Sequence, residues 1–340
     1  MRRRVLLTTL AGLLAAGCQS GDNPTESDLS PAVHALAPGY TRIDLQMQDA
    51  WGVNDNGMIV GYVKGIGAWW YLGVRRSLPA PQLPGSSYYA SNVSEDNRIS
   101  GAQAINGGAK YRALYWKTPT SSPIDLGDLG SGSAQATDVN KHGILVGVSR
   151  APYASNEWHA FRWENGVMVD INPKGYFAST AMRINDNGVI VGFADMGTPQ
   201  WHRDAIRWEP NGSITILQST TNTLNSGAYG LNTMGDVSGQ NPSFGPVVWF
   251  NGGGVQFFPS ALGAQQARGL NDKYRMVGSH PDPTAGQKAW TSLKGVEMTL
   301  PVQPTESAAA ADVNSCGWIV GWSFYGNRMT GTLWKPSNCD

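Results

Sequence analysis

Charge is scarce in this sequence and balanced in sign. Only 15% of the 340 residues are charged, and 25 Lys and Arg face 25 Asp and Glu. A chain without net charge has no general attraction for nucleic acid or for an anionic membrane surface, so we expect neither as a direct partner. Cysteine is scarce too, with three in the whole chain, which is too few for a disulfide-dense scaffold.

The common motifs of cofactor-dependent and metal-dependent enzymes are absent. The sequence has no H-E-x-x-H, no phosphate-binding P-loop, no pair of C-x-x-C motifs and no dinucleotide fingerprint. The segment GWSFYG at 321–326 departs from the G-x-S-x-G of a nucleophile elbow. We therefore expect no cofactor and no metal ion. Acid–base pairs could still be assembled from separate parts of the chain, for instance His202 with Glu157 or Asp195.

Glycine and aromatic residues are plentiful where charge is not. The chain has 42 Gly, 20 Pro and 13 Trp, and 41% of its residues are hydrophobic. That apolar content is enough for a large core, which excludes a disordered chain. Abundant turn formers together with aromatic residues are typical of all-β proteins.

The N-terminus has the features of an export signal. A basic start, MRRR, precedes the short apolar stretch VLLTTLAGLLAAG, which ends at Cys18. This segment resembles a bacterial lipobox, so we expect residues 1–17 to be a lipoprotein signal peptide and Cys18 to be lipidated; ordinary signal cleavage is the alternative. Residues 18–39 lack hydrophobic periodicity and predict a flexible tether. Gln19 after the cysteine favours the outer membrane or cell surface if the host is Gram-negative.

A motif of an Ala, an aliphatic residue three positions later, Asn four later and Gly eleven later recurs along the chain. VNDNGMIVG at 53–61 and INDNGVIVG at 184–192 are its clearest copies. Seven copies, spaced 39 to 47 residues apart, begin at Ala50, Ala90, Ala136, Ala181, Ala228, Ala267 and Ala310. A repeat of this length indicates a propeller or a solenoid.

Each repeat reads as four short strands. Asp-Asn-Gly turns join the first two strands, because Asn and Gly tolerate a positive φ. The third strand ends in Trp, as in ALYW at 113–116 and AFRW at 160–163, and a short apolar run follows it. The last repeat has no fourth strand, whereas 41–45 is a strand without a repeat. We therefore predict a single all-β domain over 40–340, a seven-bladed β-propeller whose ring is closed when strand 41–45 joins the C-terminal blade.

The third repeat carries the letters HAF at 159–161, followed by Trp163. Together with the I-N-x-x-G-x-x-V-G pattern and DLGDLG at 125–130, the chain resembles the HAF-repeat family of predicted extracellular bacterial proteins. The resemblance covers about 40–335 and weakens at Trp290, which is displaced, and at Asn97, which replaces a turn glycine. It implies an extracytoplasmic location and no particular activity.

Most motif residues have a structural explanation. We expect the repeated Gly to allow close strand packing, the repeated Asn to form turns rather than a calcium site, and the repeated Trp to anchor neighbouring blades. Cys316 and Cys339 are predicted to form a disulfide that fixes the C-terminus. A zinc site lacks histidines nearby, and a nucleophilic cysteine lacks a supporting motif.

The connections opposite the short hairpins are long and differ between repeats, and function concentrates in such loops. They are rich in aromatic residues with a few charges, a mixture that suits sugar stacking or a protein interface. The alternative is that about half of these aromatic side chains only pack inside the loops and bind nothing. The candidate ligand-binding residues are Tyr153, Trp158, His159, Tyr176, Trp201, His202, Arg203 and Tyr325. A histidine such as His159 is more often a polar residue satisfied at a strand start than a catalytic base.

We therefore expect a lipid-anchored, extracytoplasmic and monomeric propeller that contacts the membrane only through its anchor. Its expected role is that of a binding or scaffold module for a glycan or for an envelope or extracellular protein. One alternative is a carbohydrate-active enzyme, a lyase or glycosidase, with its site at the mouth of the channel. Another is a structural protein of the cell envelope.

Overall fold

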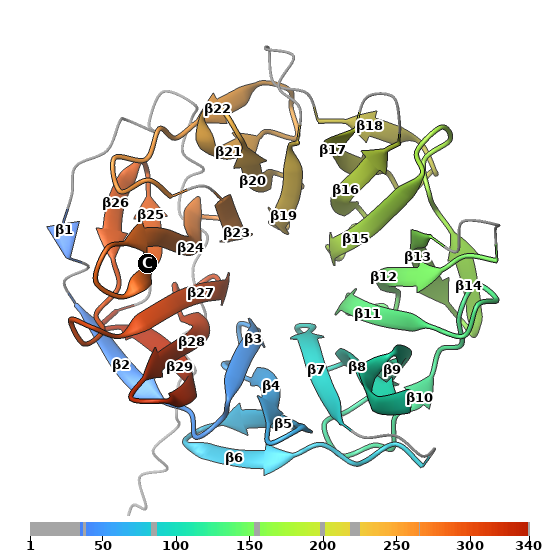
Figure 1. The fold of residues 1–340 in the computed structure, drawn as a ribbon, viewed down its shortest axis with the longest axis horizontal. Coiled ribbons are helices and arrows are strands. Elements are labelled where there is room, and N and C mark those ends of the chain that lie inside the picture. The colour runs from blue at the N-terminus through green and yellow to red at the C-terminus, as the bar shows by residue number, and fades with distance from the viewer. Residues whose placement is uncertain are drawn as a thin grey trace, which may run out of the picture.

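The computed structural model confirms a seven-bladed β-propeller, with seven sheets of four or five strands arranged in a ring (Figure 1). The structure describes residues 35–36, 39–82, 87–152, 157–197, 201–217, 225–264 and 266–338. No helix among these residues is long and apolar enough to cross a membrane.

In each of the first four blades, the strands follow one another in chain order from the innermost, at the channel, to the outermost (Figure 1). Blade one contains β3 (Asp49–Val53), β4 (Ile59–Val63), β5 (Ile66–Tyr71) and β6 (Val74–Ser77). Blade two contains β7 (Tyr88–Val93), β8 (Ile99–Ile105), β9 (Lys110–Trp116) and β10 (Ile124–Asp125), with a 3-10 turn at Asn106–Gly108. Blade three contains β11 (Ala134–Val139), β12 (Leu145–Arg150), β13 (Trp158–Glu164) and β14 (Val167–Asp170). Blade four contains β15 (Ala178–Ile184), β16 (Ile190–Met196), β17 (His202–Trp208) and β18 (Ile214–Ile216).

The remaining three blades include the two places where the N-terminal segment joins a sheet. Blade five contains β19 (Gly227–Leu231), β20 (Val237–Asn241), β21 (Gly245–Trp249) and β22 (Val255–Phe257). Blade six contains β23 (Gln266–Leu270), β24 (Arg275–Asp282), β25 (Gly286–Leu293), β26 (Val296–Thr299) and β1 (Ala35–Leu36). Blade seven contains β27 (Ser307–Val313), β28 (Ile319–Tyr325), β29 (Arg328–Pro336) and β2 (Tyr40–Asp44).

The N-terminal strand β2 is the outermost strand of blade seven. It pairs antiparallel with β29, with Arg42 opposite Trp334, which is the pairing expected for 41–45. The two-residue strand β1 pairs parallel with β26. Part of the segment expected to be only a tether, 18–39, therefore adds to the edge of blade six, since that edge offers unpaired backbone groups.

The motif glycine of each second strand lies against the backbone of the first strand, as expected. A Cβ on Gly147 would lie 2.0 Å from the carbonyl oxygen of Gln135, and one on Gly192 would lie 2.0 Å from that of Thr180. The other five glycines, Gly61, Gly101, Gly239, Gly278 and Gly321, meet the equivalent carbonyl at 2.0 to 2.5 Å. A side chain at this position would force the two strands apart.

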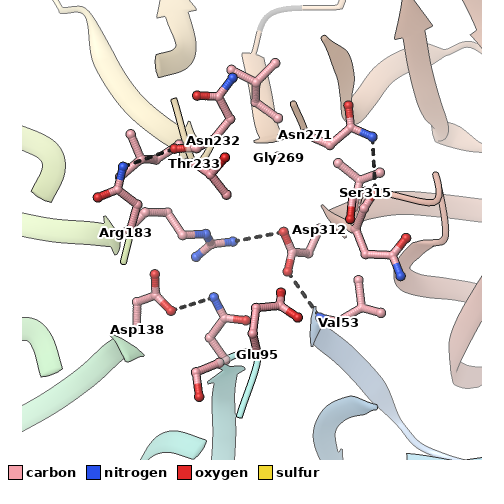
Figure 2. A pocket seen from close by; sticks show the side chains of 18 of the residues that line it. Val53, Glu95, Asp138, Arg183, Asn232, Thr233, Gly269, Asn271, Asp312 and Ser315 are labelled. Atoms are coloured by element: carbon pink, nitrogen blue, oxygen red, sulfur yellow. Dashed lines mark hydrogen bonds and ion pairs between the residues drawn. The ribbon is translucent and has the colours of Figure 1, made fainter. Parts of the chain in front are cut away.

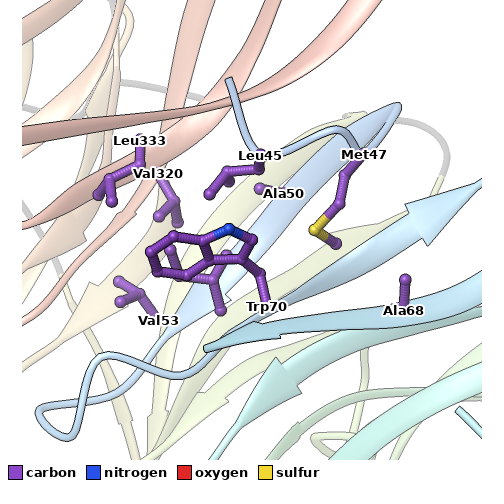
Figure 3. Close-up of a cluster of buried hydrophobic side chains, with 9 residues drawn as sticks. Leu45, Met47, Ala50, Val53, Ala68, Trp70, Val320 and Leu333 are labelled. Carbon is purple, nitrogen blue, oxygen red and sulfur yellow. The ribbon is translucent and has the colours of Figure 1, made fainter. Parts of the chain in front are cut away.

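Buried tryptophans join neighbouring blades. The indole N–H of Trp116 donates to the carbonyl of Pro79 at 3.0 Å, and that of Trp208 donates to the carbonyl of Ile171 at 2.8 Å. Both acceptors lie in the link that enters the tryptophan's own blade. At the junction of blades seven and one, Trp70 packs against Val320 and Leu333 (Figure 3). Burial of such rings between sheets stabilises the ring as a whole.

The hairpins between the first two strands are uniform. Their fourth residue has a positive φ in every blade, between 60° and 89°, at Gly57, Asn97, Gly143, Gly188, Gly235, Tyr274 and Gly317. Gly and Asn adopt this conformation readily, which explains Asn97, whereas Tyr274 adopts it at a cost in strain.

Candidate binding site at the mouth of the central channel

Every innermost strand contains an irregularity of the β-bulge type immediately after the motif Ala, as between Ala50 and Gly52 and between Ala181 and Arg183. In a bulge, two successive residues oppose one residue of the partner strand, so the strand bends and its side chains are redirected. The first residue after every motif Ala, and the second residue in six of the seven blades, line the central channel.

The first bulge residues of the seven blades meet in one cavity. Its volume is about 330 Å³, and it is lined by Trp51, Ser91, Thr137, Met182, Tyr229, Arg268 and Ala311, together with Arg183 and Gln266. These residues precede the hairpin in their strands, so the cavity opens on the face opposite the hairpins, where the long loops lie. Its size is near the lower end for small-molecule sites.

Two aromatic groups support this cavity from opposite sides. The ring of Trp51 lies 5.2 Å from that of Tyr62 and 5.1 Å from that of Tyr89, between centroids, and it meets Tyr89 edge-on. On the other side, Tyr229 packs edge-to-face on Phe193 at 6.2 Å. Trp51 and Tyr229 therefore have their orientations fixed by neighbouring rings.

A buried carboxyl group lies behind Trp51. Asp49 is 5% exposed, and its Oδ1 accepts the N–H of Ala50 at 2.8 Å. Burial raises the pKa of Asp49 to about 7, although its hydrogen bonds to Trp51 and Ala50 and the charge of Arg268 oppose the shift. The carboxyl therefore titrates near neutral pH.

The second bulge residues form the next layer of the channel, towards the hairpins (Figure 2). Asp138 accepts the side-chain amide of Asn92 at 2.7 Å and the N–H of Ile184 at 2.8 Å. Asp312 accepts the N–H of Val53 at 3.2 Å, and Arg183 reaches across to it, with 4.0 Å between Nη2 and Oδ1. Glycines fill the remaining places, because a Cβ at Gly52 would lie 2.1 Å from the Asn92 side chain.

The hairpin side of the channel is acidic. Burial raises the pKa of Asp138 to about 6 and also raises that of Asp312, while the nearby Arg183 lowers both. At the mouth, burial and then the charge of Asp55 raise the pKa of Glu95 to about 7. Carboxylates crowded into a narrow channel hold protons that they would lose in water.

The motif asparagines do more than shape turns. Asn185 accepts the N–H groups of Asn187 and Val189 at 3.1 Å each, and its amide donates to the carbonyl of Asn232 in the next blade at 3.2 Å. We call the set of such links the asparagine belt. Five links between blades are present, made by Asn54, Asn140, Asn185, Asn271 and Asn314. These hydrogen bonds, within the turn and between blades, account for the repetition of the asparagine.

The predicted loop residues of blade four gather into one group. Tyr176 donates to Asp204, and His202 Nε2 lies 3.2 Å from the same carboxylate. Trp201 is 59% exposed and packs edge-on against Phe177. This group lies outside the set of residues that line the cavity.

Arg203 connects the blade-four group to the channel. It binds Asp195 through two hydrogen bonds of 2.7 and 3.0 Å, lies 3.9 Å above the Phe193 ring and also hydrogen-bonds Tyr229. It therefore contacts a residue that lines the cavity.

The other predicted residues lie elsewhere. His159 is buried in blade three and lies 2.8 Å from Asp170 through Nδ1, and Trp158 packs against Arg150. Tyr325 is exposed at the edge of blade seven, 56% accessible. Tyr153, Cys18 and Cys339 lie outside the described residues, so the lipidation and the Cys316–Cys339 disulfide stay predictions.

Sequence reasoning missed Trp51, Arg183, Tyr229 and Arg268. The signal was present, because the two positions after each motif Ala vary between copies while the positions around them repeat. Positions that vary between otherwise similar copies of the repeat show where the blades differ from one another. In the part of the chain that the structure describes, no group of three or more His, Cys, Asp or Glu is placed to hold a metal ion.

No family model matches this chain, and no curated protein matches it. Among solved structures, it is similar to a virginiamycin B lyase from Staphylococcus aureus crystallised with quinupristin, at 12% identity and a TM-score of 0.58, covering 87% of this chain and 98% of that one. It is similar to the β-propeller domain of the Trilobed protease from Pyrococcus furiosus, at 12% identity and a TM-score of 0.56, covering 87% and 95%. It is also similar to a puromycin hydrolase, at 12% identity and a TM-score of 0.54, covering 81% and 49%. At such low identity these likenesses establish the fold alone: the chain is a seven-bladed β-propeller.

Proposed function

We propose that this protein is a lipid-anchored, extracytoplasmic binding module of the HAF-repeat type that recognises a glycan at the loop-face mouth of its channel. The observation that carries the proposal is the convergence of all seven first bulge residues on one cavity of about 330 Å³. Variable residues held on a uniform, rigid ring and gathered at one cavity are suited to specific recognition.

The lining suits a sugar. Trp51 and Tyr229 offer rigid aromatic faces, on which the apolar C–H face of a pyranose ring stacks. Ser91, Thr137 and Gln266 offer hydroxyl and amide groups that hydrogen-bond sugar hydroxyls. A concave cavity of this size favours a small group or a chain end over the flat surface of a folded partner.

An enzyme is the second candidate function, and Asp49 favours it. A carboxyl with a pKa of about 7 beside the cavity could act as a general acid or base at neutral pH. Asp49 contacts Trp51 and is not among the residues that line the cavity. A bound ligand would therefore meet the Trp51 ring rather than this carboxyl, and the binding module is the stronger proposal.

A binding panel tests both candidates. The purified protein is incubated with envelope and environmental polysaccharides, and retention and released oligosaccharide are measured in the same tubes. We expect retention without product, and we expect Trp51→Ala and Tyr229→Ala each to lower affinity about tenfold through lost stacking. Trp201→Ala is the matched control, since Trp201 is an exposed aromatic residue away from the cavity.

Three results would change the conclusion. Released oligosaccharide would establish the enzyme instead. Loss of binding in Trp201→Ala but not in Trp51→Ala would place the site on the blade-four loops. No retention of any polysaccharide would refute the glycan proposal and direct the search to envelope proteins.

A further inference from the structure

The loop-face cavity is positively charged in a chain without net charge. Two of its nine lining residues, Arg183 and Arg268, are cationic, and none is acidic. None of the seven first bulge positions carries a carboxylate, whereas two of the seven second bulge positions, Asp138 and Asp312, do. Among the bulge residues, acidic side chains are therefore confined to the second layer, and Arg183 of that layer also lines the loop-face cavity.

Arg268 has no acidic partner among the described residues. Its side chain makes one hydrogen bond, a long one of 3.4 Å from Nε to Gln266 Oε1. The surrounding protein removes part of its hydration, and the neighbouring Arg183 repels its charge, so its pKa is lowered, with Tyr229 and Asp49 opposing the shift. Two guanidinium groups close enough to repel each other favour an anion that neutralises both.

Arg183 sets the depth that an anion could reach. It lines the loop-face cavity and the layer below it, where it faces Asp312 at 4.0 Å and lowers the pKa of Asp138. At the level of Arg183 the channel is also lined by Asp138 and Asp312, and nearer the hairpins it is lined by Glu95. An anion entering from the loop face would therefore be held at the two arginines and repelled from the rest of the channel.

Given the proposed function, on which this step rests, we propose that the cavity selects a sugar unit that carries an oxyanion, either a uronate carboxylate or a sulfate ester. The guanidinium of Arg268 binds the oxyanion, supported by Arg183, while Trp51 and Tyr229 hold the sugar ring. A planar guanidinium presents paired N–H groups that match two oxygens of such a group.

Calorimetric titration with three matched oligosaccharides tests this proposal. They are an oligogalacturonate, a sulfated galactose oligosaccharide of the same length and its neutral counterpart. We expect at least one anionic probe to bind about tenfold or more tightly than the neutral one, and to weaken with added salt while the neutral one does not. The tighter anionic probe identifies the source of the oxyanion.

Variants at Arg268 separate charge from shape. Arg268→Gln should remove the preference for the anionic probe over its neutral counterpart, and Arg268→Lys, which keeps the charge without the planar guanidinium, should retain part of that preference. The matched control is Arg162→Gln on the outer surface of blade three, where Arg162 pairs with Glu164. It makes the same change of charge away from the channel.

The possible results distinguish the failure of oxyanion selection from the failure of the glycan site itself. Equal or tighter binding of the neutral probe, sensitive to Trp51→Ala, would refute oxyanion selection and keep the glycan site. An anionic preference that survives Arg268→Gln would refute the assignment of the oxyanion to Arg268. No binding of any probe, on a panel that also retains nothing, would refute the glycan site itself.

Discussion

The asparagine belt makes a quantitative prediction about stability. Asn185→Ala removes two accepted hydrogen bonds and one donated hydrogen bond from a residue that is 8% exposed. At about 1 kcal/mol for each hydrogen bond, and more where a buried N–H is left unpaired, the loss is about 2–4 kcal/mol. Because the hydrogen bond from the side-chain amide of Asn185 joins two blades, the loss of stability should appear in the unfolding of the whole ring rather than as local fraying.

Urea unfolding followed by tryptophan fluorescence measures this loss. With an m-value of about 3 kcal/mol per molar, the midpoint should fall by roughly 1 M. The control is Asn211→Ala, because Asn211 also accepts two bonds from Ser213, at 2.9 and 2.8 Å, but lies exposed in a turn between outer strands. Its cost should stay below about 1 kcal/mol. Equal losses in the two variants would refute the belt as a source of stability.

Blade two supplies the reverse test, since Ser94 replaces the motif asparagine there. Its hydroxyl accepts the N–H of Arg98 at 3.0 Å and donates to Asp96, but it makes no link to blade three. Ser94→Asn should keep the first bond and add a donor to the carbonyl of Asn140. We expect a gain of up to about 1 kcal/mol in the same assay, and a loss of 1 kcal/mol or more would contradict the explanation.

Three further changes test other parts of the structure. The pKa of Asp49 is about 7 in the folded protein and 3.8 in the unfolded chain. The free energy of unfolding should therefore fall as the pH rises between these two values, because the folded state binds the proton more tightly. Asp49→Asn should flatten that fall and be about 1–3 kcal/mol more stable than the native protein at pH 8 in urea unfolding. Gly147→Ala would place a Cβ 2.0 Å from a neighbouring carbonyl and should cost about 3 kcal/mol or more, whereas Gly252→Ala, with open space around it, should change the midpoint little. If the predicted disulfide forms, Cys316→Ser should raise the number of titratable thiols by one, at Cys339, and cost about 3 kcal/mol; a thiol count that falls by one would refute the pairing.

The architecture of the ring could be predicted from local chemistry. Asp-Asn-Gly turns, strand-ending tryptophans and a repeat of about 43 residues specify the blade, because each acts through contacts within one blade or with its neighbour. The strand at 41–45 precedes the first repeat, and the last repeat lacks a fourth strand, so the sequence also predicted that these two parts pair. In the structure, β2 pairs with β29 of the last blade.

The site needed the tertiary structure. Trp51 and Tyr229 are 178 positions apart in the sequence, and the ring brings both to one cavity. The loops that were expected to be functional carry Trp201 and Tyr325, which are exposed and lie outside that cavity. The sequence alone could not reveal which variable residues converge.

Sequence by itself therefore determined the blades, their number and the residues that hold neighbouring blades together, since these depend on turn conformation, strand alternation and close packing. Only the tertiary structure decided what faces the channel, because a bulge in every innermost strand redirects two side chains that strict alternation would place differently. It also decided the polarity of that channel, with Arg268 nearer the loop face, Arg183 lining both layers, and Asp138, Asp312 and Glu95 on the hairpin side. Residues far apart in the chain meet there because the ring places one residue from each blade into every layer.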